Sequence, residues 1–282
     1  MPNYGYHLAR AQARLVRQTY RSVLPFVVSR PVVPRATFPI EVFAYSGEAA
    51  LPEQVASIRS FLRFAGRPPR FTVVSDGTYS RRSIHLLEQL DPSVCVSPSS
   101  DWIPTGMPEA MQSYLTTHST GRQLALIMSL PKQGPALYVD SDVLFCAEAD
   151  DLARIAQSKD VPALYLLDAK FSGDERLFRD GGELELSPVN TGFLFLFKQL
   201  DWSLSVRRFL ELKDRPNFFT NQTMTHLTMH ANGAAPLDPR KYVLQLDDQF
   251  VYPDRYASRD IAMRHYVNPV RHKFWTTFAR GR

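Results

Sequence analysis

The chain has 282 residues, 44% of them hydrophobic, which suffices to bury the core of one large domain and excludes disordered, collagen-like and coiled-coil proteins. No apolar run approaches the roughly 18 residues that a membrane span needs, and the N-terminus lacks a signal-peptide segment, so we expect a cytoplasmic protein. Cys95 and Cys146 are too few for a disulfide framework and lack zinc-site spacing, so we expect reduced, packed thiols.

The formal charge of +5 is distributed unevenly along the chain. Residues 1–40 hold six arginines and no acid, and residues 261–282 hold four arginines, one lysine and no acid. The 220 residues between them carry a net charge of −6. An acidic body does not offer the broad basic face of a nucleic-acid-binding protein, so we expect no nucleic-acid partner.

The first predicted element is a basic amphipathic helix over residues 6–24, with Arg10, Arg14, Arg17 and Arg21 along one stripe. Pro25 should end it, and three prolines within residues 30–39 predict an extended tether. We therefore expect an arm over residues 1–36 and one domain over residues 37–282.

Two interpretations of this helix stay open. It docks on an anionic membrane surface, which would place the protein at the inner face of the membrane. Alternatively, it packs on the domain or at a dimer contact.

The domain begins with a βαβ unit, formed by a strand at 40–45, a helix at 51–65 and a strand at 70–74. The elements predicted after it are a helix at 121–130, a strand at 136–139, a helix at 150–157, strands at 163–167 and 193–197, helices at 201–213 and 220–231, and a strand at 242–246. This order predicts an α/β fold with a mostly parallel central sheet, followed by a basic, aromatic tail.

Two carboxylates, Asp140 and Asp142, follow the buried strand at 136–139. Open α/β sheets place ligands at the carboxyl ends of their strands. Two oxygen ligands suit a hard divalent ion, which would neutralise a diphosphate and stabilise it as a leaving group. An acidic surface turn is the alternative, but the flanking apolar residues would make an unpaired carboxylate pair costly.

A second candidate segment, residues 264–275, mixes basic and aromatic side chains. The neutral imidazole of His265 can complete a set of metal ligands, and Arg271 or Lys273 can approach phosphates as fixed positive charge. The alternative is a terminal aromatic anchor with incidental bases.

Together these segments resemble a known family, the GT-A fold glycosyltransferases that use nucleotide sugars. Within that family they are most similar to the retaining glycogenin-like and bacterial galactosyltransferase-type enzymes. Four segments carry the resemblance in chain order: Val-Phe-Ala-Tyr-Ser at 42–46, Leu-Tyr-Val-Asp-Ser-Asp at 137–142, Pro-Val-Asn-Thr-Gly-Phe at 188–193, and His-Tyr-Val-Asn-Pro-Val-Arg-His-Lys-Phe-Trp at 265–275. The resemblance implies a single GT-A (Rossmann-like) domain and transfer of a sugar from a nucleotide diphosphate sugar to an acceptor hydroxyl. The acceptor would be a glycan, a lipid-linked molecule or a small molecule, and an N-terminal helix docked on a membrane would bring a lipid-linked or glycan acceptor to the site.

Carried onto this sequence, the resemblance implies that Asp140, Asp142 and His265 bind a divalent metal, Mn²⁺ or Mg²⁺, and that Asp140 and Lys273 contact the donor. The last of the four segments, residues 265–275, departs from the family's pattern in its spacing, because His265 and Lys273 are eight positions apart. Whether His272 replaces His265 therefore stays open, although the following aromatic residue favours His265.

The same resemblance implies a nucleoside site near the first strand. Ala44 and Tyr45 would contact the base, which is uridine in most of the resembled enzymes. Asp76 can approach the nucleoside or cap its own turn, and Arg122 can face the donor or remain a solvated helix base.

Asn190 and Gln222 are the candidates nearest the anomeric carbon. Asn221 stands where the family often has an acid, so the obvious carboxylate nucleophile is missing. A retaining reaction would then depend on departure of the diphosphate and attack by the acceptor hydroxyl on the same face, with the amides orienting both partners.

Other residues and functions rank lower. His226 and His230 are four residues apart but lack the glutamate of a His-Glu-x-x-His zinc motif. A sugar nucleotidyltransferase would need a glycine-rich basic loop after the first strand, and residues 46–51 offer one glycine and no base. The alternatives that remain are a catalytically silent nucleotide- or glycan-binding relative and a membrane adaptor.

Overall fold

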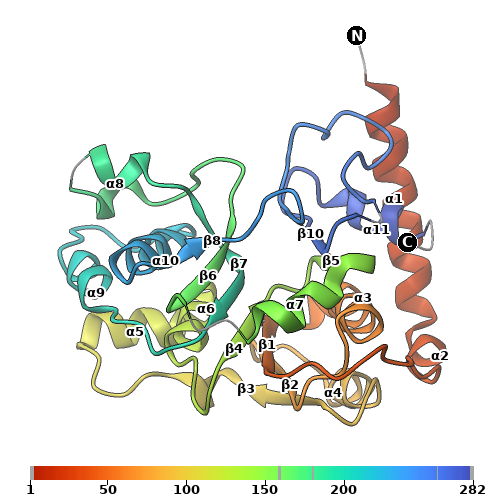
Figure 1. Cartoon of the computed structure of the whole chain (residues 1–282), viewed down its shortest axis with the longest axis horizontal. Coiled ribbons are helices and arrows are strands. Elements are labelled where there is room, and N and C mark those ends of the chain that lie inside the picture. Colours follow the sequence, from red (N-terminus) through yellow and green to blue (C-terminus); the bar gives the residue numbers. More distant parts are fainter. Residues whose placement is uncertain (1–2, 158–159, 180, 259, 280–282) are drawn as a thin grey trace.

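The computed structural model describes residues 3–157, 160–179, 181–258 and 260–279. A seven-stranded sheet with strand order β3-β2-β1-β4-β7-β6-β8 runs through the centre, and helices cover both of its faces (Figure 1). Its strands are β1 (Glu41–Ser46), β2 (Phe71–Ser75), β3 (Val94–Pro98), β4 (Ala136–Val139), β6 (Ala163–Leu167), β7 (Val189–Leu196) and β8 (Ala235–Pro236). The α-helices are α1 (Tyr4–Ser22), α2 (Leu24–Val28), α3 (Leu51–Phe64), α4 (Arg81–Glu88), α5 (Glu109–Thr117), α6 (Ser119–Met128), α7 (Asp151–Ile155), α8 (Gly181–Glu185), α9 (Ser203–Leu210), α10 (Thr220–Ala231) and α11 (His272–Phe278).

The predicted α/β architecture is confirmed. Neighbouring strands are parallel from β3 to β4 and again between β6 and β8, whereas β7 runs antiparallel to both β4 and β6. The antiparallel course of β7 brings its first residues to the carboxyl ends of β4 and β6, where open sheets hold ligands.

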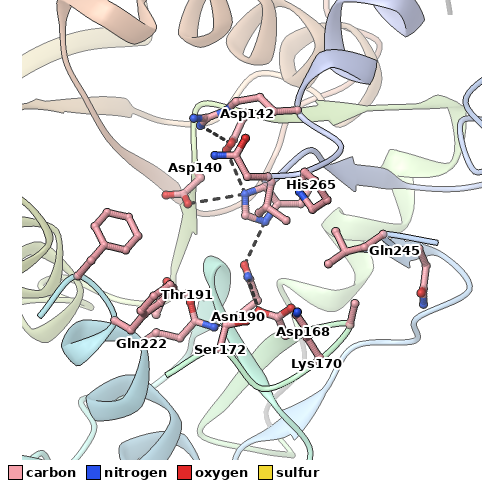
Figure 2. Close-up of a pocket in the computed structure, with 18 of the residues that line it drawn as sticks. Asp140, Asp142, Asp168, Lys170, Ser172, Asn190, Thr191, Gln222, Gln245 and His265 are labelled. Atoms are coloured by element: carbon pink, nitrogen blue, oxygen red, sulfur yellow. Dashed lines mark hydrogen bonds and ion pairs between the residues drawn. The ribbon is translucent and has the colours of Figure 1, made fainter. Parts of the chain in front are cut away.

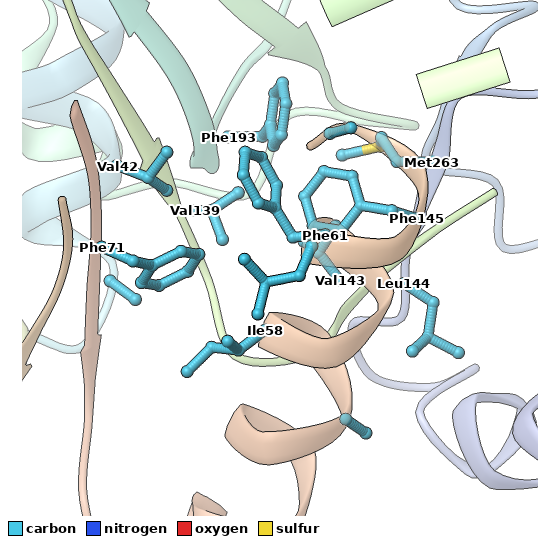
Figure 3. Packing of buried hydrophobic residues seen from close by; sticks show 14 of the residues in the cluster. Val42, Ile58, Phe61, Phe71, Val139, Val143, Leu144, Phe145, Phe193 and Met263 are labelled. Atoms are coloured by element: carbon cyan, nitrogen blue, oxygen red, sulfur yellow. The ribbon is translucent and has the colours of Figure 1, made fainter. Parts of the chain in front are cut away.

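Side chains of the central strands alternate between two hydrophobic clusters, as the pleat of a strand requires. Val42 and Val139 pack beneath α3 on one face, while Phe43 and Tyr138 pack toward α5 and α6 on the other. Figure 3 shows the first cluster, in which Phe61 of α3 reaches the strands. Burial on both faces explains why these strands are continuous apolar runs in the sequence.

A second, three-stranded sheet is built from short strands far apart in the chain. Its order is β5 (Val143–Phe145), β10 (Met263–His265) and β9 (Tyr242–Val243). β5 and β10 are antiparallel, with Val143 opposite His265. This pairing returns the C-terminal segment to the end of β4.

The N-terminal arm is part of the packed molecule. α1 lies against α11, and its Ala9, Ala13 and Tyr20 are buried (Figure 1). The helix predicted over residues 6–24 is α1, which ends at Ser22, before Pro25. Pro25 begins no extended segment, because it occupies the first turn of α2, where no amide hydrogen is needed. Nor are residues 30–39 a free tether, since Phe38 is buried and its amide donates to the carbonyl of Arg67.

Among the residues that the structure describes, no helix combines the length and the apolar character of a transmembrane span.

Candidate active site

Three predicted metal ligands meet at the carboxyl end of β4. One ligand atom from each of Asp140, Asp142 and His265 lies within 4.8 Å of the others (Figure 2). The two aspartates follow β4 directly, and the β5–β10 pairing delivers His265 to them. The amide of Tyr266 donates to the carbonyl of Asp142 at 2.9 Å, which fixes the register at the site.

Asn190 orients the imidazole of His265. Its Oδ1 accepts from the amide of Gly192 at 2.9 Å and lies 3.0 Å from His265 Nδ1. Because this oxygen can only accept, Nδ1 carries the hydrogen, and Nε2 is the nitrogen directed toward Asp142 Oδ1 at 3.0 Å. Ligating histidines are held by the same kind of hydrogen bond in metalloproteins, so the three residues fit a divalent ion.

Gly192 provides the room for this cluster. A Cβ atom at this position would lie 2.1 Å from Cε1 of His265 and 2.8 Å from Oδ2 of Asp140. Both distances are too short for any side chain, so the glycine of the Asn-x-Gly segment is required by the packing of the imidazole against β7.

The charges in the cluster shift one another's titration. Burial opposes protonation of His265, but Asp142 and Asp140 outweigh it and raise the pKa of the imidazole. Burial likewise raises the pKa of Asp140. Burial works in the same direction on Asp142, but His265 and Arg271 overcome it and lower the pKa of this carboxyl, which is therefore the firmly ionised member of the pair.

Arg271 lies beside the predicted ligands. Its Nη2 donates to Asp142 Oδ2 at 2.5 Å, while Oδ1 faces His265. The side chain is 54% exposed and lines the same cleft, so its remaining donors can reach a bound anion.

Lys273 is not brought into the cleft, although the resemblance placed it at the donor. Its ammonium is fully buried, donates to the carbonyls of Val251 and Pro253 at 2.6 and 3.0 Å, and lies 3.4 Å from Asp248. The longer spacing of the closing motif turns Lys273 inward along α11 and leaves Arg271 at the site.

Polar side chains hold the carboxylate of Asp140 in place through hydrogen bonds. Tyr138 and Gln123 both donate to Asp140 Oδ1, at 2.7 and 3.0 Å. Asn221 donates to the amide oxygen of Gln123 at 2.9 Å. Asn221, which replaces the family's acid, is thus part of the scaffold of the metal ligand.

Asp168 is a site residue that the sequence analysis missed. Its Oδ2 accepts from the amides of both predicted residues, Asn190 at 2.9 Å and Gln222 at 3.0 Å. The sequence contained one signal for it, because Asp168 directly follows the strand predicted at 163–167, at a carboxyl end. The cleft therefore holds a carboxylate opposite the metal ligands, although none precedes Gln222.

These groups line one cavity of about 810 Å³, large enough for an extended polar ligand. Figure 2 shows the three candidate metal ligands on one side and Asp168, Lys170 and Ser172 across from them. The loop after β9 adds Gln245 to the wall. The cavity thus offers cation ligands at one end and hydrogen-bonding groups at the other.

The four residues predicted around a nucleoside lie outside this cavity lining, near the ends of β1 and β2. Ala44 is fully buried, and Tyr45 is half-buried beside it. Arg122 donates to the carbonyl of Asp76 at 2.9 Å. The carboxylate of Asp76 accepts hydrogen bonds from the amide and the hydroxyl of Thr78, two residues further along the same turn. In this structure Asp76 therefore caps its own turn.

The remaining histidines of the sequence analysis do not join the cluster. His272 lies against the ring of Tyr6 of α1, so His265 is the histidine that meets the two aspartates. His226 and His230 each direct Nε2 at a backbone carbonyl, of Glu183 and of Ser187. Among the described residues, neither histidine belongs to a group of three side chains that could hold a metal ion, so a second metal site has no support.

Comparison with known proteins gives a match of fold. No protein-family model matches the sequence, and no curated protein matches it by sequence. The galactosyltransferase LgtC, solved with donor and acceptor sugar analogues, is 13% identical over 86% of this chain and 96% of its own, with a TM-score of 0.55. The chain has the GT-A fold.

Two further GT-A structures agree with this result. Mouse xyloside xylosyltransferase 1 is 14% identical, with a TM-score of 0.56 over 82% of this chain and 99% of its own. The bifunctional glycosyltransferase WbbM is 15% identical, with a TM-score of 0.57, and the match covers 89% of this chain and 50% of WbbM. All three neighbours are glycosyltransferases, so the predicted fold is confirmed.

Proposed function

We propose that this GT-A protein is a metal-dependent glycosyltransferase that moves a sugar from a nucleotide diphosphate sugar to an acceptor hydroxyl. The cluster of Asp140, Asp142 and His265 at the cleft carries the proposal, because two of these polar groups are buried and a GT-A fold that had lost catalysis would not need them there. Mn²⁺ or Mg²⁺ held there would neutralise the donor diphosphate and stabilise it as a leaving group.

The protein's own residues divide the remaining tasks. Arg271 presents fixed positive charge to the diphosphate from beside Asp142. Asn190, Gln222 and Asp168 form a hydrogen-bonded shelf that orients the donor sugar. Because Asp168 is held by two amides, its position is fixed before substrate binds, as efficient orientation requires.

Retention of configuration is the stereochemical outcome that we propose. The shelf lies across the cleft from the metal ligands, which leaves one side of the bound sugar for the leaving diphosphate and the acceptor hydroxyl. Proton NMR of the first-formed product tests it, since the anomeric coupling reports whether the donor's configuration is kept. An inverted product contradicts this part of the proposal.

The donor base is proposed to be uridine, on the resemblance alone. A thermal-shift screen of nucleoside diphosphates with Mn²⁺ tests it, because at equal concentration a ligand that binds the folded state more tightly raises Tm further. Uridine diphosphate should give the largest increase in Tm. A larger increase in Tm with another nucleoside diphosphate would contradict uridine as the donor base.

We further propose that α1 rests on an anionic membrane surface at its cytoplasmic face. Tyr4, Leu8 and Leu15 lie on one side of the helix and are 77%, 60% and 66% exposed. Arg21, Arg30 and Arg35 of the same arm are exposed, and residues 1–40 hold no acid, which favours contact with anionic headgroups. A lipid-linked acceptor would then be presented near the cleft.

Sedimentation with phosphatidylserine vesicles tests this contact. Deleting residues 1–36 would remove Tyr20, Leu24 and Val28 from the core, so substitutions on the exposed stripe are the better probe. The full chain should co-sediment at low salt, and Leu8→Gln with Leu15→Gln should release it. Equal sedimentation of both proteins, or none by the wild type, removes the membrane role.

A further inference from the structure

A second cavity of about 450 Å³ lies between α1 and the segment before α11. It shares Asn268, Pro269 and Arg271 with the cleft, so it adjoins the candidate metal site. Three arginines of α1 also line it: Arg10, Arg14 and Arg17. The arginine stripe seen in the sequence therefore faces this cavity, while the stripe with Leu8 and Leu15 faces solvent.

The positive charge around the cavity is only partly neutralised. Arg17 donates to Glu53 Oε1 at 2.5 Å, and Trp275 donates to the same oxygen at 2.8 Å, so the one acid in the lining is already occupied. Among the described residues, the guanidinium of Arg10 donates to the neutral hydroxyl of Tyr6 at 3.2 Å, lies near the ring of the same residue, and has no ion pair. In the part of the chain that the structure describes, Arg14 has no hydrogen bond or ion pair.

Several guanidinium groups around one concave site repel one another, and an anion relieves that repulsion. Guanidinium is also the side chain whose geometry best matches phosphate oxygens, which it binds through paired donors. Here the helix spacing of Arg10, Arg14 and Arg17 sets successive donors one turn apart along the wall of the cavity.

We propose that this cavity is a phosphoryl-binding site beside the catalytic cleft, with Arg10 and Arg14 as its principal ligands and Arg271 at the junction. The phosphoryl group has two available sources, the diphosphate of the donor or a phosphate on the acceptor. Only this use of the site rests on the proposed transferase function, because the cavity and its charges exist without it.

Direct binding of inorganic pyrophosphate to the full-length protein tests the site. The protein is stripped with EDTA and dialysed, so that no metal ion in the cleft attracts the probe. Arg271 belongs to both linings, so the test depends on Arg10 and Arg14, which line the second cavity and not the cleft. Calorimetry at low salt should show pyrophosphate binding to the wild type. Arg10→Gln with Arg14→Gln should weaken it at least about 10-fold, because two charge-assisted contacts are lost.

Arg21→Gln with Arg30→Gln is the matched control, because it removes the same charge from the same arm outside the cavity. It should leave the affinity within about twofold of the wild type. No binding to the wild type, or an equal loss in the control, overturns the proposal. Pyrophosphate binding that persists in a protein without transferase activity would separate this site from the proposed function.

A second titration, with uridine diphosphate and Mn²⁺, identifies the source of the phosphate. If the Arg10 and Arg14 variant loses affinity for uridine diphosphate by the same factor as for pyrophosphate, the cavity holds the donor phosphates. If its affinity for uridine diphosphate is unchanged while that for pyrophosphate falls, the site serves a phosphate on the acceptor.

Discussion

Oδ1 of Asn190 lies 3.0 Å from Nδ1 of His265, although the two residues are 75 positions apart in the chain. The same oxygen accepts from Gly192, and the amide nitrogen of Asn190 donates to Asp168. One asparagine thus orients the histidine of the candidate metal site and the carboxylate across the cleft.

Replacing Asn190 by Ala should weaken Mn²⁺ binding about 10- to 100-fold, because the imidazole loses the acceptor that fixes its tautomer. Calorimetric titration with Mn²⁺ measures the effect. Asn232→Ala is the control, since Asn232 also makes several hydrogen bonds but lies on the surface after α10. Equal metal affinity in both variants would remove Asn190 from the site.

Gly192→Ala should abolish most metal binding while the protein stays folded. The new methyl group would meet His265 and Asp140, so one ligand must move. We expect a loss of at least about 10-fold in Mn²⁺ affinity. Gly181→Ala adds the same methyl group where nothing lies within 4 Å and should change neither affinity nor Tm. Unchanged Mn²⁺ binding by Gly192→Ala would contradict the ligand geometry.

Replacing Arg271 and replacing Lys273 should have different effects. Arg271→Gln should weaken binding of a nucleoside diphosphate about 10-fold with little change in Tm, because its side chain is half exposed and faces the cleft. Lys273→Gln should lower the free energy of unfolding by about 1–3 kcal/mol, since it leaves buried carbonyl oxygens without their donor. The opposite pattern would return Lys273 to the donor site.

The metal-free protein should show a pH-dependent contribution from His265. Its pKa is raised in the folded state, so the imidazolium stabilises the fold fully below the unfolded value of about 6.5, and this contribution is lost as pH rises through the folded value. Thermal unfolding of EDTA-treated wild type and His265→Gln across pH measures it. The Tm advantage of the wild type should shrink as pH rises, and an advantage that grows would contradict the ion pair with Asp142.

The local parts of the site could be predicted from the sequence, whereas the contacts between distant parts could not. Asp140 and Asp142 follow a strand whose apolar run is unmistakable, and Asn190 and Gln222 line the same cavity as these aspartates. β5 and β10 are only three residues each and are separated by more than a hundred positions, so no local pattern predicts their pairing. That pairing brings His265 to the two aspartates.

The N-terminal arm shows the same limit. Its helical period was visible, but Pro25 is compatible with either the end of one helix or the first turn of another. The face of α1 that packs is lined by Ala9, Ala13 and Tyr20, and only the position of α11 reveals that the arginines turn toward a cavity.

Nucleotide release from nucleotide sugars tests the central claim most directly. The wild type is incubated with a panel of donors and Mn²⁺, and release of the nucleoside diphosphate is measured with and without EDTA, beside Asp140→Asn and Asp142→Asn. We predict release from at least one donor, its loss with EDTA, and a decrease of at least about 100-fold in each variant. Release from no donor under any metal, or undiminished release by the two variants, would contradict the account.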